Sequence, residues 1–361
     1  MARTQSEYHL DDQTPLPPPE PPPPAGLPKD DVYSPAPPGL FAVPPELTDF
    51  RLLESTPLNV RNAEAVGPHP LNKQSDPSRI IFYEGKYHFW MIDKLRLPDC
   101  SGSRPKPSEN RKSWILYLNS EDGKAWTAVD YVPLGRDGSS YDLAIEQADV
   151  LFYEGRFYLF SEGWTCNSAK YGRREPGIIC LTSDAPEGPW EQVGDFMVEP
   201  SGDGVSFDTS QVVNPRHVYF DGKWFMYYKG HKPDRPTDNG VAISDSLTGP
   251  YTKFEANPLL HGHGHFAWRY KHGIIMVMFD GWYDKDYTRI LWTEDGVRFV
   301  PLVETEGTFQ FGSLYCPNDP LFGEPVSQEH VTRYWGLQSV YHRGTTGWII
   351  ERIEWQFGPE Q

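Results

Sequence analysis

Four stretches of the chain share one pattern of apolar and polar positions around a tight turn. In each stretch, apolar residues alternate with polar ones on both sides of an acidic or basic residue followed by glycine. Glycine supplies the positive φ angle that two-residue hairpin turns require. The pattern therefore predicts four β-hairpins, with turns at Glu84-Gly85, Glu154-Gly155, Asp221-Gly222 and His272-Gly273.

A second shared phrase follows each hairpin. The four copies are "SEDGKAW" from Ser120, "SDAPEGPW" from Ser183, "SDSLTGPY" from Ser244 and "TEDGVRF" from Thr293. Their Ser, Thr and Asp side chains are typical caps of tight turns, and an aromatic residue then returns to the core. Hairpin, strand, turn and strand together predict repeated units of four antiparallel strands, about 50–70 residues each.

A fifth, degenerate unit spans residues 333–357. We expect it to close against a strand over residues 49–55, because closure removes the exposed sheet edges that favour aggregation. The predicted fold is all-β, a five-bladed β-propeller, and no helix of ordinary length is predicted.

The chain before the propeller is rich in proline. Proline lacks a backbone donor and fixes φ, so residues 1–48 are expected to form an extended or disordered tail outside the propeller. Its PxxP spacing suits an SH3-type partner, whereas an arm lying on a neighbour is the more ordinary interpretation. The expected division is a tail over 1–48 and a catalytic propeller over 49–361.

Composition narrows the classes of partner. The net charge of −17 argues against nucleic acid and anionic membranes, and fits a neutral or cationic small ligand. The 14% aromatic content is typical of β-rich carbohydrate-handling proteins. The N-terminus has no apolar leader and no stretch reaches membrane-spanning length, so a cytoplasmic location is expected. The four cysteines are interpreted as free thiols, with one disulfide left open.

The first strand of each blade lines the central channel, so the residues just before it are candidates for a ligand site. Counting back from the turn glycine of each blade shows which residues should lie at about the same height along the channel. They carry acidic, amide, guanidinium and imidazole groups: Asp76, Glu146, Gln147, Asp149, Asn214, Arg216, His263 and His265. Glu162 and Trp164 follow in "FSEGW". Cleavage of a glycosidic bond needs one group to protonate the leaving oxygen and another to activate water or attack the sugar. Carboxylates and imidazoles perform both tasks.

Each candidate also has an ordinary structural interpretation. Asp76 before proline can cap a turn, Asn214 can satisfy backbone groups, and Glu162 can be a buried, paired acid. His261, His263 and His265 alternate along one predicted strand face, which leaves a zinc site open beside solvated or hydrogen-bonded histidines. No cofactor is expected, although a zinc or calcium ion in the channel remains an option.

Several ordered phrases resemble glycoside hydrolase family 117. They include "SDPSRIIFYEGKYHFWM" from Ser75, "HVYFDGKWFMYYKG" from His217, "GHGHFAWRYKHGIIMVMFDG" from Gly262 and "RILWTEDGVRFVPL" from Arg289. The resemblance spans about residues 47–355. It implies a five-bladed propeller that releases 3,6-anhydro-L-galactose from the non-reducing end of agar oligosaccharides, related to the inverting family 43 enzymes that act on arabinose and xylose.

The resemblance also implies roles for two residues, with Asp76 as the general base and His263 as the general acid. From the residues themselves, Glu146 on the neighbouring blade is the alternative acid. The candidate substrate contacts are Asp149, Gln147, Glu162, Trp164, Asn214, Arg216 and His265. This chain departs from the family at Gly264, where the family has glutamate.

Other departures bear on substrate and mechanism. The chain has Asn214 where the family has an acidic pair, and Glu146 and Asp149 where the family is mostly neutral. Two functions stay open: an exo-acting, inverting glycosidase acting on a short oligosaccharide, and a propeller that binds sugar without cleaving it. A homodimer is left open, although the proline-rich tail replaces the helical segment that the family uses for dimer swapping.

Overall fold

The structure is a computed structural model. It describes residues 36, 39–61, 74–96, 111–165, 176–233, 237–280, 287–306, 310–324, 331–341 and 348–358. Every structural statement below refers to these ranges.

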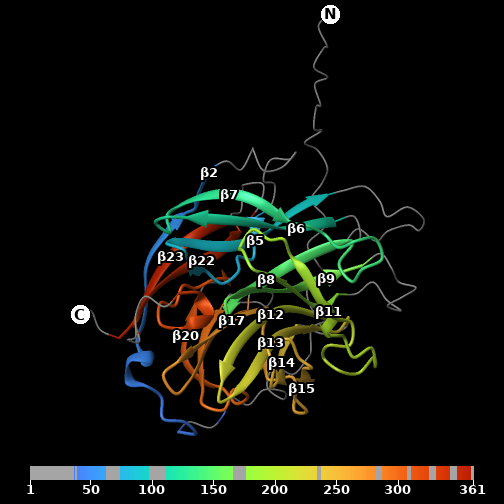
Figure 1. Cartoon of the computed structure of the whole chain (residues 1–361). Coiled ribbons are helices and arrows are strands. Elements are labelled where there is room, and N and C mark those ends of the chain that lie inside the picture. Colours follow the sequence, from blue (N-terminus) through green and yellow to red (C-terminus); the bar gives the residue numbers. More distant parts are fainter. Residues whose placement is uncertain are drawn as a thin grey trace, which may run out of the picture.

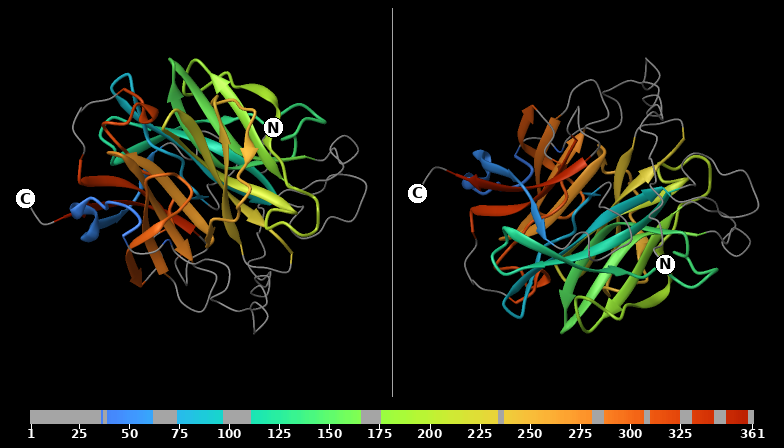
Figure 2. Two further views of the ribbon diagram at one scale, coloured as in Figure 1. Left: turned by 90° about the horizontal axis from the view of Figure 1, so that it is seen from below. Right: turned by 90° about the horizontal axis from the view of Figure 1, so that it is seen from above.

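The described strands form separate, mainly antiparallel sheets that follow one another around a common axis (Figures 1 and 2). Blade 2 contains β8 (Ala144–Tyr153), β9 (Arg156–Trp164), β10 (Gly177–Ser183) and β11 (Glu191–Val198). Blade 3 contains β12 (Gln211–Phe220), β13 (Lys223–His231), β14 (Asp238–Ser244) and β15 (Thr252–Lys253), with β16 (Leu260–His261) also on β14. Blade 4 contains β17 (Gly264–Tyr270), β18 (Gly273–Asp280), β19 (Tyr287–Thr293) and β20 (Val300–Glu306).

Blades 1 and 5 complete the ring and confirm the predicted five-bladed propeller. In blade 1, β3 (Gln74–Ser75) and β4 (Ile81–Tyr83) both pair with β5 (Lys86–Arg96). From β5 outward, the next strands are β6 (Arg111–Ser120), β7 (Ala125–Val132) and β2 (Asn59–Arg61). Blade 5 contains β21 (Gln310–Phe311), β22 (Arg333–Tyr341), β23 (Trp348–Phe357) and β1 (Phe50–Pro57).

The two ends of the chain close the ring. The outermost strand of blade 5 is β1, which pairs antiparallel with β23 from Phe50↔Phe357 to Pro57↔Glu351 (Figure 1). The chain then passes to blade 1, where β2 pairs parallel with β7. This confirms the closure expected from the sequence, and it ties the first and last blades together at their outer edges.

The predicted hairpin turns are confirmed in blades 1 to 3 and shifted in blade 4. Glu84, Glu154 and Asp221 have φ near 49°, and the glycines after them have φ of 74–79°. In blade 4, Tyr270 pairs with Gly273, so the turn residues are Lys271 and His272. The expected turn at His272-Gly273 is therefore wrong by one residue. Gly273 is instead the first residue of β18, where a side chain would collide with the Trp292 ring.

Large aromatic side chains fill the spaces between the blades. Trp90, Trp126, Trp224, Trp268 and Trp292 are all at most 2% exposed. Burial of one such ring removes roughly 150–250 Å² from water, which makes these residues the main apolar contribution to the fold. Most of the aromatic content is thus structural.

Residues 39–48, here called the N-terminal arm, pack on the propeller. Leu47 is fully buried, and Leu40, Phe41 and Val43 lie against the same core cluster. Glu46, in the short 3-10 turn η1 (Pro45–Thr48), accepts a hydrogen bond from Tyr270 Oη at 2.7 Å and pairs with Lys271. The N-terminal arm therefore packs on the propeller, although it precedes the boundary expected at residue 48. The PxxP segment lies outside the described residues.

Helix contributes little to the described residues, which contain only η1 and the 3-10 turn η2 (Pro320–Phe322) as helical segments. None of them holds a helix long and apolar enough to cross a bilayer. Cys180 and Cys316 are buried free thiols, while Cys100 and Cys166 fall outside the described residues.

Candidate active site

Three inner strands are interrupted where they begin, at the end of the channel here called the mouth. The pairing of β8 with β9 shifts between Glu146 and Asp149, and that of β12 with β13 shifts between Val213 and Arg216. Each break holds a residue with left-handed backbone: Gln147 at φ 50° and Asn214 at φ 56°. Asp76 at φ 53° occupies the same place in blade 1. Bulges of this kind redirect side chains and are common beside active sites.

Asp76 is the candidate base, and it is held from two sides. Its backbone N–H donates to Ser339 Oγ of blade 5 at 2.8 Å. Its Oδ1 accepts a long hydrogen bond from Gln147 Nε2 of blade 2 at 3.4 Å. The side chain is half-buried, so water can still reach it. Asp76 is therefore an oriented carboxylate at the mouth, and Gln147 faces it.

Glu146 and Glu162 lie next to each other across blade 2. They are register partners of β8 and β9, which places their Cα atoms about 4.5–5.5 Å apart. Glu162 is 3% exposed, whereas Glu146 is half-buried and its Oε1 accepts a hydrogen bond from Ser113 of blade 1. Trp164, at the end of β9, is also half-buried. The structure thus brings these three predicted residues together beside Gln147.

A buried layer of charge lies beneath the mouth. Arg79, Asp149 and Arg216 each stand six residues before the turn glycine of their blade, and Phe266 has the matching place before His272 in blade 4. The Arg79 and Arg216 guanidinium carbons both lie 5.7 Å from the centre of the Phe266 ring. We call these four residues the ionic layer.

Asp149 is the anion of the ionic layer. Its Oδ1 accepts from Arg79 Nε at 3.2 Å, and its Oδ2 accepts from the backbone N–H of His217 at 2.8 Å. Burial alone would raise the pKa of Asp149, but Arg79, His217 and Arg216 outweigh burial and lower it. The side chain is fully buried. It is therefore a structural counter-ion in this structure, and the expected contact with substrate is corrected.

Arg216 is also buried, although the sequence suggested a substrate contact. It is 2% exposed, and its Nη1 donates to the carbonyl oxygens of Ala148 and Pro215 at 3.2 and 2.8 Å. The layer holds two guanidinium groups and one carboxylate, and Arg216 attracts Asp76 electrostatically. The surplus positive charge of the ionic layer therefore lies below Asp76, the candidate base, rather than at the surface.

The electrostatics of His263 differ from the expectation. Burial, together with Lys229 and His231, holds the pKa of His263 well below its usual value. The sequence-based argument assumed an ordinary imidazole that is half-protonated near neutral pH. The lowered pKa favours the neutral imidazole near neutral pH, so it does not support the argument for His263 as the acid.

His265 is a buried neutral imidazole. It is 1% exposed, and its Nδ1 lies 2.7 Å from Asn239 Oδ1, so Nδ1–H donates to the amide oxygen. Burial lowers its pKa to about 3. The expected role as an accessible substrate contact is not supported, because the ring is enclosed between blades 3 and 4.

The three alternating histidines do not share a strand. His261 lies in β16 on blade 3, where its Nδ1 is 2.7 Å from Asp238 Oδ1, whereas His265 lies in β17 of blade 4. The chain crosses between blades at Gly262 and His263, which overturns the expected common face. In the described part of the chain, no group of three His, Cys, Asp or Glu side chains lies close enough to hold a metal ion.

A cavity of about 420 Å³ opens at the mouth end of blade 3. Ser210 comes directly before β12, and Lys232 comes directly after β13, so both border the same end of the blade as Asn214. Asn214 itself is 6% exposed. None of the candidate site residues lines this cavity.

Sequence reasoning missed Arg79, His217 and Ser339. Arg79 could have been found, because it stands at the same distance from its turn glycine as Asp149 and Arg216. Ser339 carries no comparable signal, since blade 5 lacks the repeated hairpin phrase. Its contact with Asp76 joins residues 263 positions apart.

Comparison with known proteins identifies the fold but not the family. No family profile and no curated protein matches the chain. A family 117 glycoside hydrolase from the marine bacterium Zobellia galactanivorans matches with a TM-score of 0.68 and 21% identity, over 85% of this chain and 90% of that one. The resemblance stated from the sequence is confirmed at the level of the fold.

More distant structures share the same architecture. A β-1,2-mannobiose phosphorylase from Listeria innocua matches with a TM-score of 0.55 and 10% identity, over 85% of this chain and 96% of that one. A putative glycoside hydrolase from Parabacteroides distasonis matches with a TM-score of 0.53 and 13% identity, over 78% and 86%. These neighbours are sugar-processing proteins, and at such identities they report the fold alone.

Proposed function

We propose that the protein is a glycoside hydrolase that releases a monosaccharide from the end of a short oligosaccharide. The single observation that carries this proposal is Asp76, a half-buried carboxylate in left-handed backbone at the mouth. Backbone strain of this kind persists only where surrounding contacts impose it, and it clusters at functional sites. Exo action, and an anhydro-galactose-like or arabinose-like sugar, follow from the family resemblance.

In the proposed mechanism Asp76 is the general base. A water molecule on one face of the sugar ring gives its proton to a carboxylate oxygen as it attacks the anomeric carbon. Gln147 Nε2 and Ser339 Oγ, at 3.4 Å from Oδ1 and 2.8 Å from the backbone N of Asp76, fix the direction of that carboxylate. The free oxygen is then available to the water.

The acid in this proposal is Glu146 rather than His263. A neutral imidazole with a strongly lowered pKa has no proton to give near neutral pH. Glu146 is half-buried and has a second carboxylate, Glu162, as its register partner. Glu162 is only 3% exposed, so Glu146 is the member of the pair that a sugar at the mouth would contact. Inversion requires the acid and base carboxyl groups to lie about 6.5–9.5 Å apart.

The first experiment is a substrate screen. Purified protein is incubated with aryl-glycosides and red-algal oligosaccharides, with and without inorganic phosphate, and released monosaccharide is identified. We expect free sugar whose release does not depend on phosphate, because water is the nucleophile. Release of a sugar phosphate only when phosphate is present would replace hydrolysis with phosphorolysis.

A second experiment assigns the acid. An activated aryl-glycoside has a leaving group that needs no protonation, so loss of the acid is rescued on it. We expect rescue for Glu146→Gln and no such selective rescue for His263→Ala. Rescue of His263→Ala alone would return the acid to blade 4.

The second candidate function is a propeller that binds sugar without cleaving it. Two observations favour binding without cleavage. The lowered pKa of His263 favours its neutral form, and Asn214 has an amide where the resembling family has an acidic pair. Saturable binding of an oligosaccharide, with no product after prolonged incubation at any pH between 4 and 8, would establish this function instead.

A further inference from the structure

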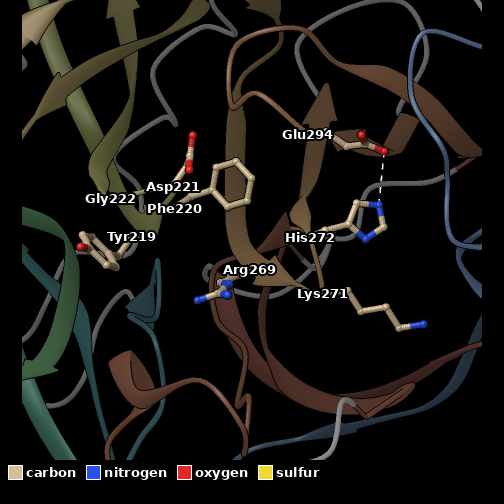
Figure 3. A pocket seen from close by; sticks show the side chains of 8 residues that line it. All are labelled: Tyr219, Phe220, Asp221, Gly222, Arg269, Lys271, His272 and Glu294. Carbon is tan, nitrogen blue, oxygen red and sulfur yellow. Dashed lines mark ion pairs between the residues drawn. The ribbon is translucent and has the colours of Figure 1, made fainter.

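A second cavity lies at the other end of the inner strands from the candidate active site. It has a volume of about 540 Å³ and is bordered by the ends of β12 and β17 and the hairpin turns after them (Figure 3). We call this the turn end. Tyr219 follows Asn214 by five residues on β12, so at about 3.3 Å per residue the two regions are roughly 16 Å apart.

Among the described residues, the cavity contains one cation, Arg269, that forms no direct ion pair. Lys271 pairs with Glu46 of the N-terminal arm, and His272 Nε2 lies 3.3 Å from Glu294 Oε1. Arg269 is exposed, and within the described residues its guanidinium forms no ion pair or hydrogen bond. It attracts the buried carboxyl group of Asp319 electrostatically, without direct contact. In Figure 3 its side chain extends toward Tyr219, while Lys271 points away.

An exposed aromatic ring lies across the cavity from Arg269. Tyr219 is 39% exposed, and its ring lies 5.0 Å from the ring of Trp224. Packing on Trp224 holds Tyr219 in place, and the exposed part of the ring remains available to a ligand. A planar guanidinium binds carboxylate or sulfate through two parallel hydrogen bonds, and a rigid ring offers an apolar surface to the C–H face of a sugar.

We propose that this cavity is a second binding site for an anionic saccharide, in which Arg269 holds a sulfate or carboxylate group and Tyr219 supports the sugar ring. On a protein with a net charge of −17, an open cation in a concave site selects for such a group. The saccharide class rests on the proposed function, whereas the anion site rests on Arg269 itself. The site would hold a longer or neighbouring chain while the mouth acts on an end.

The test is direct binding by calorimetry at low and physiological salt. The probes are a sulfated galacto-oligosaccharide, a uronate oligosaccharide and a neutral oligosaccharide of equal length. The Asp76→Asn background prevents turnover. We expect an anionic probe to bind and Arg269→Gln to weaken binding about tenfold or more, the effect of losing a charge-assisted pair of hydrogen bonds. Which anionic probe binds tells sulfate from carboxylate.

Arg289→Gln is the matched control, because Arg289 is a partly exposed arginine of the same blade that already pairs with Glu304 at 3.0 Å. Arg289→Gln should leave binding of the anionic probe unchanged, whereas Tyr219→Ala should weaken that binding. Equal binding by wild type and Arg269→Gln, or equal weakening by Arg289→Gln, would overturn the site. Hydrolysis of a small aryl-glycoside should be unaffected by Arg269→Gln. Binding at Arg269 without any hydrolysis would refute the proposed function and leave this site standing.

Discussion

The two ends of the inner strands differ in backbone and in charge. At the turn end, the two-residue turns repeat from blade to blade, and pairs such as Lys223 with Asp245 lie in solvent. At the mouth, strands β8 and β12 break register, polar residues take left-handed backbone, and Asp149 pairs with Arg79 in full burial. The inner strands are therefore regular at the turn end, where hairpins join them to the next strand. They are irregular at the mouth, where they present polar side chains.

This difference shows what each end can tolerate. A charge at the turn end keeps its water, so losing its partner costs little. A charge in the ionic layer has given up its water, so losing its partner leaves it unsatisfied. Substitutions that are chemically alike should consequently have unequal effects at the two ends.

The largest effect is expected for Asp76→Asn. An amide cannot accept the proton from the attacking water, so turnover should fall by about 10²–10⁴-fold. The fold should be intact, because Asp76 uses its backbone N–H, not its carboxylate, to bind Ser339. Initial rates and the thermal midpoint are measured together. Near-wild-type turnover would remove Asp76 from the mechanism.

The next effect compares two Asp→Asn changes. Asp149→Asn leaves Arg79 buried beside an uncharged partner, so the free energy of unfolding should fall by about 3–5 kcal/mol. Asp245→Asn removes the exposed partner of Lys223 and should change it by at most about 1 kcal/mol. Denaturant titration measures both. Similar losses for the two variants would contradict the contrast between the ends.

A pH effect should come from His265. The pKa of this imidazole is lowered to about 3 in the folded protein, so below pH 6.5 the unfolded chain binds the extra proton first. Stability should fall as pH decreases, by about 2 kcal/mol between pH 6.5 and 5 from this residue. His265→Asn should show a shallower slope in that window and an unchanged slope above pH 7. Parallel slopes throughout would show that folding does not lower the pKa of His265.

The smallest effect concerns a hairpin turn. Gly155 has φ of 79° and open space where a Cβ atom would lie, so Gly155→Ala adds only backbone strain. We expect a loss of about 1 kcal/mol in stability and no change in turnover. Glu154→Asn should cost nothing, because asparagine tolerates the left-handed φ of 49° at that position. A loss of activity in Gly155→Ala would mean that the turn end influences the mouth.

Much of the fold could be predicted from repetition. The hairpin glycines at 85, 155 and 222 and the capped turns after them were readable, because turn geometry depends on a few neighbouring residues. Asp122, for example, caps its turn by accepting from the backbone N–H groups of Lys124 and Ala125 at 2.8 and 2.9 Å. The turn of blade 4 was misplaced because no glycine lies within it.

The site was only partly predictable. Counting back from the turns identified the level at which Asp76, Glu146 and Asn214 lie. It could not separate half-buried residues from buried ones, so Asp149 and His265 were assigned to substrate instead of to the interior. A residue's level along a strand is a local property, whereas its exposure depends on the neighbouring blades.

The sequence by itself determined the repeating unit, the number of blades and the closure of β1 against β23, because hydrophobic alternation and turn chemistry act over short stretches. Only the tertiary structure decided which groups ionise. Lys229 lies on a different blade from His263, and together with burial it keeps that imidazole neutral, while Arg79 of blade 1 keeps Asp149 charged. Charge depends on solvent access and on distances between residues far apart in the chain, and folding alone sets both.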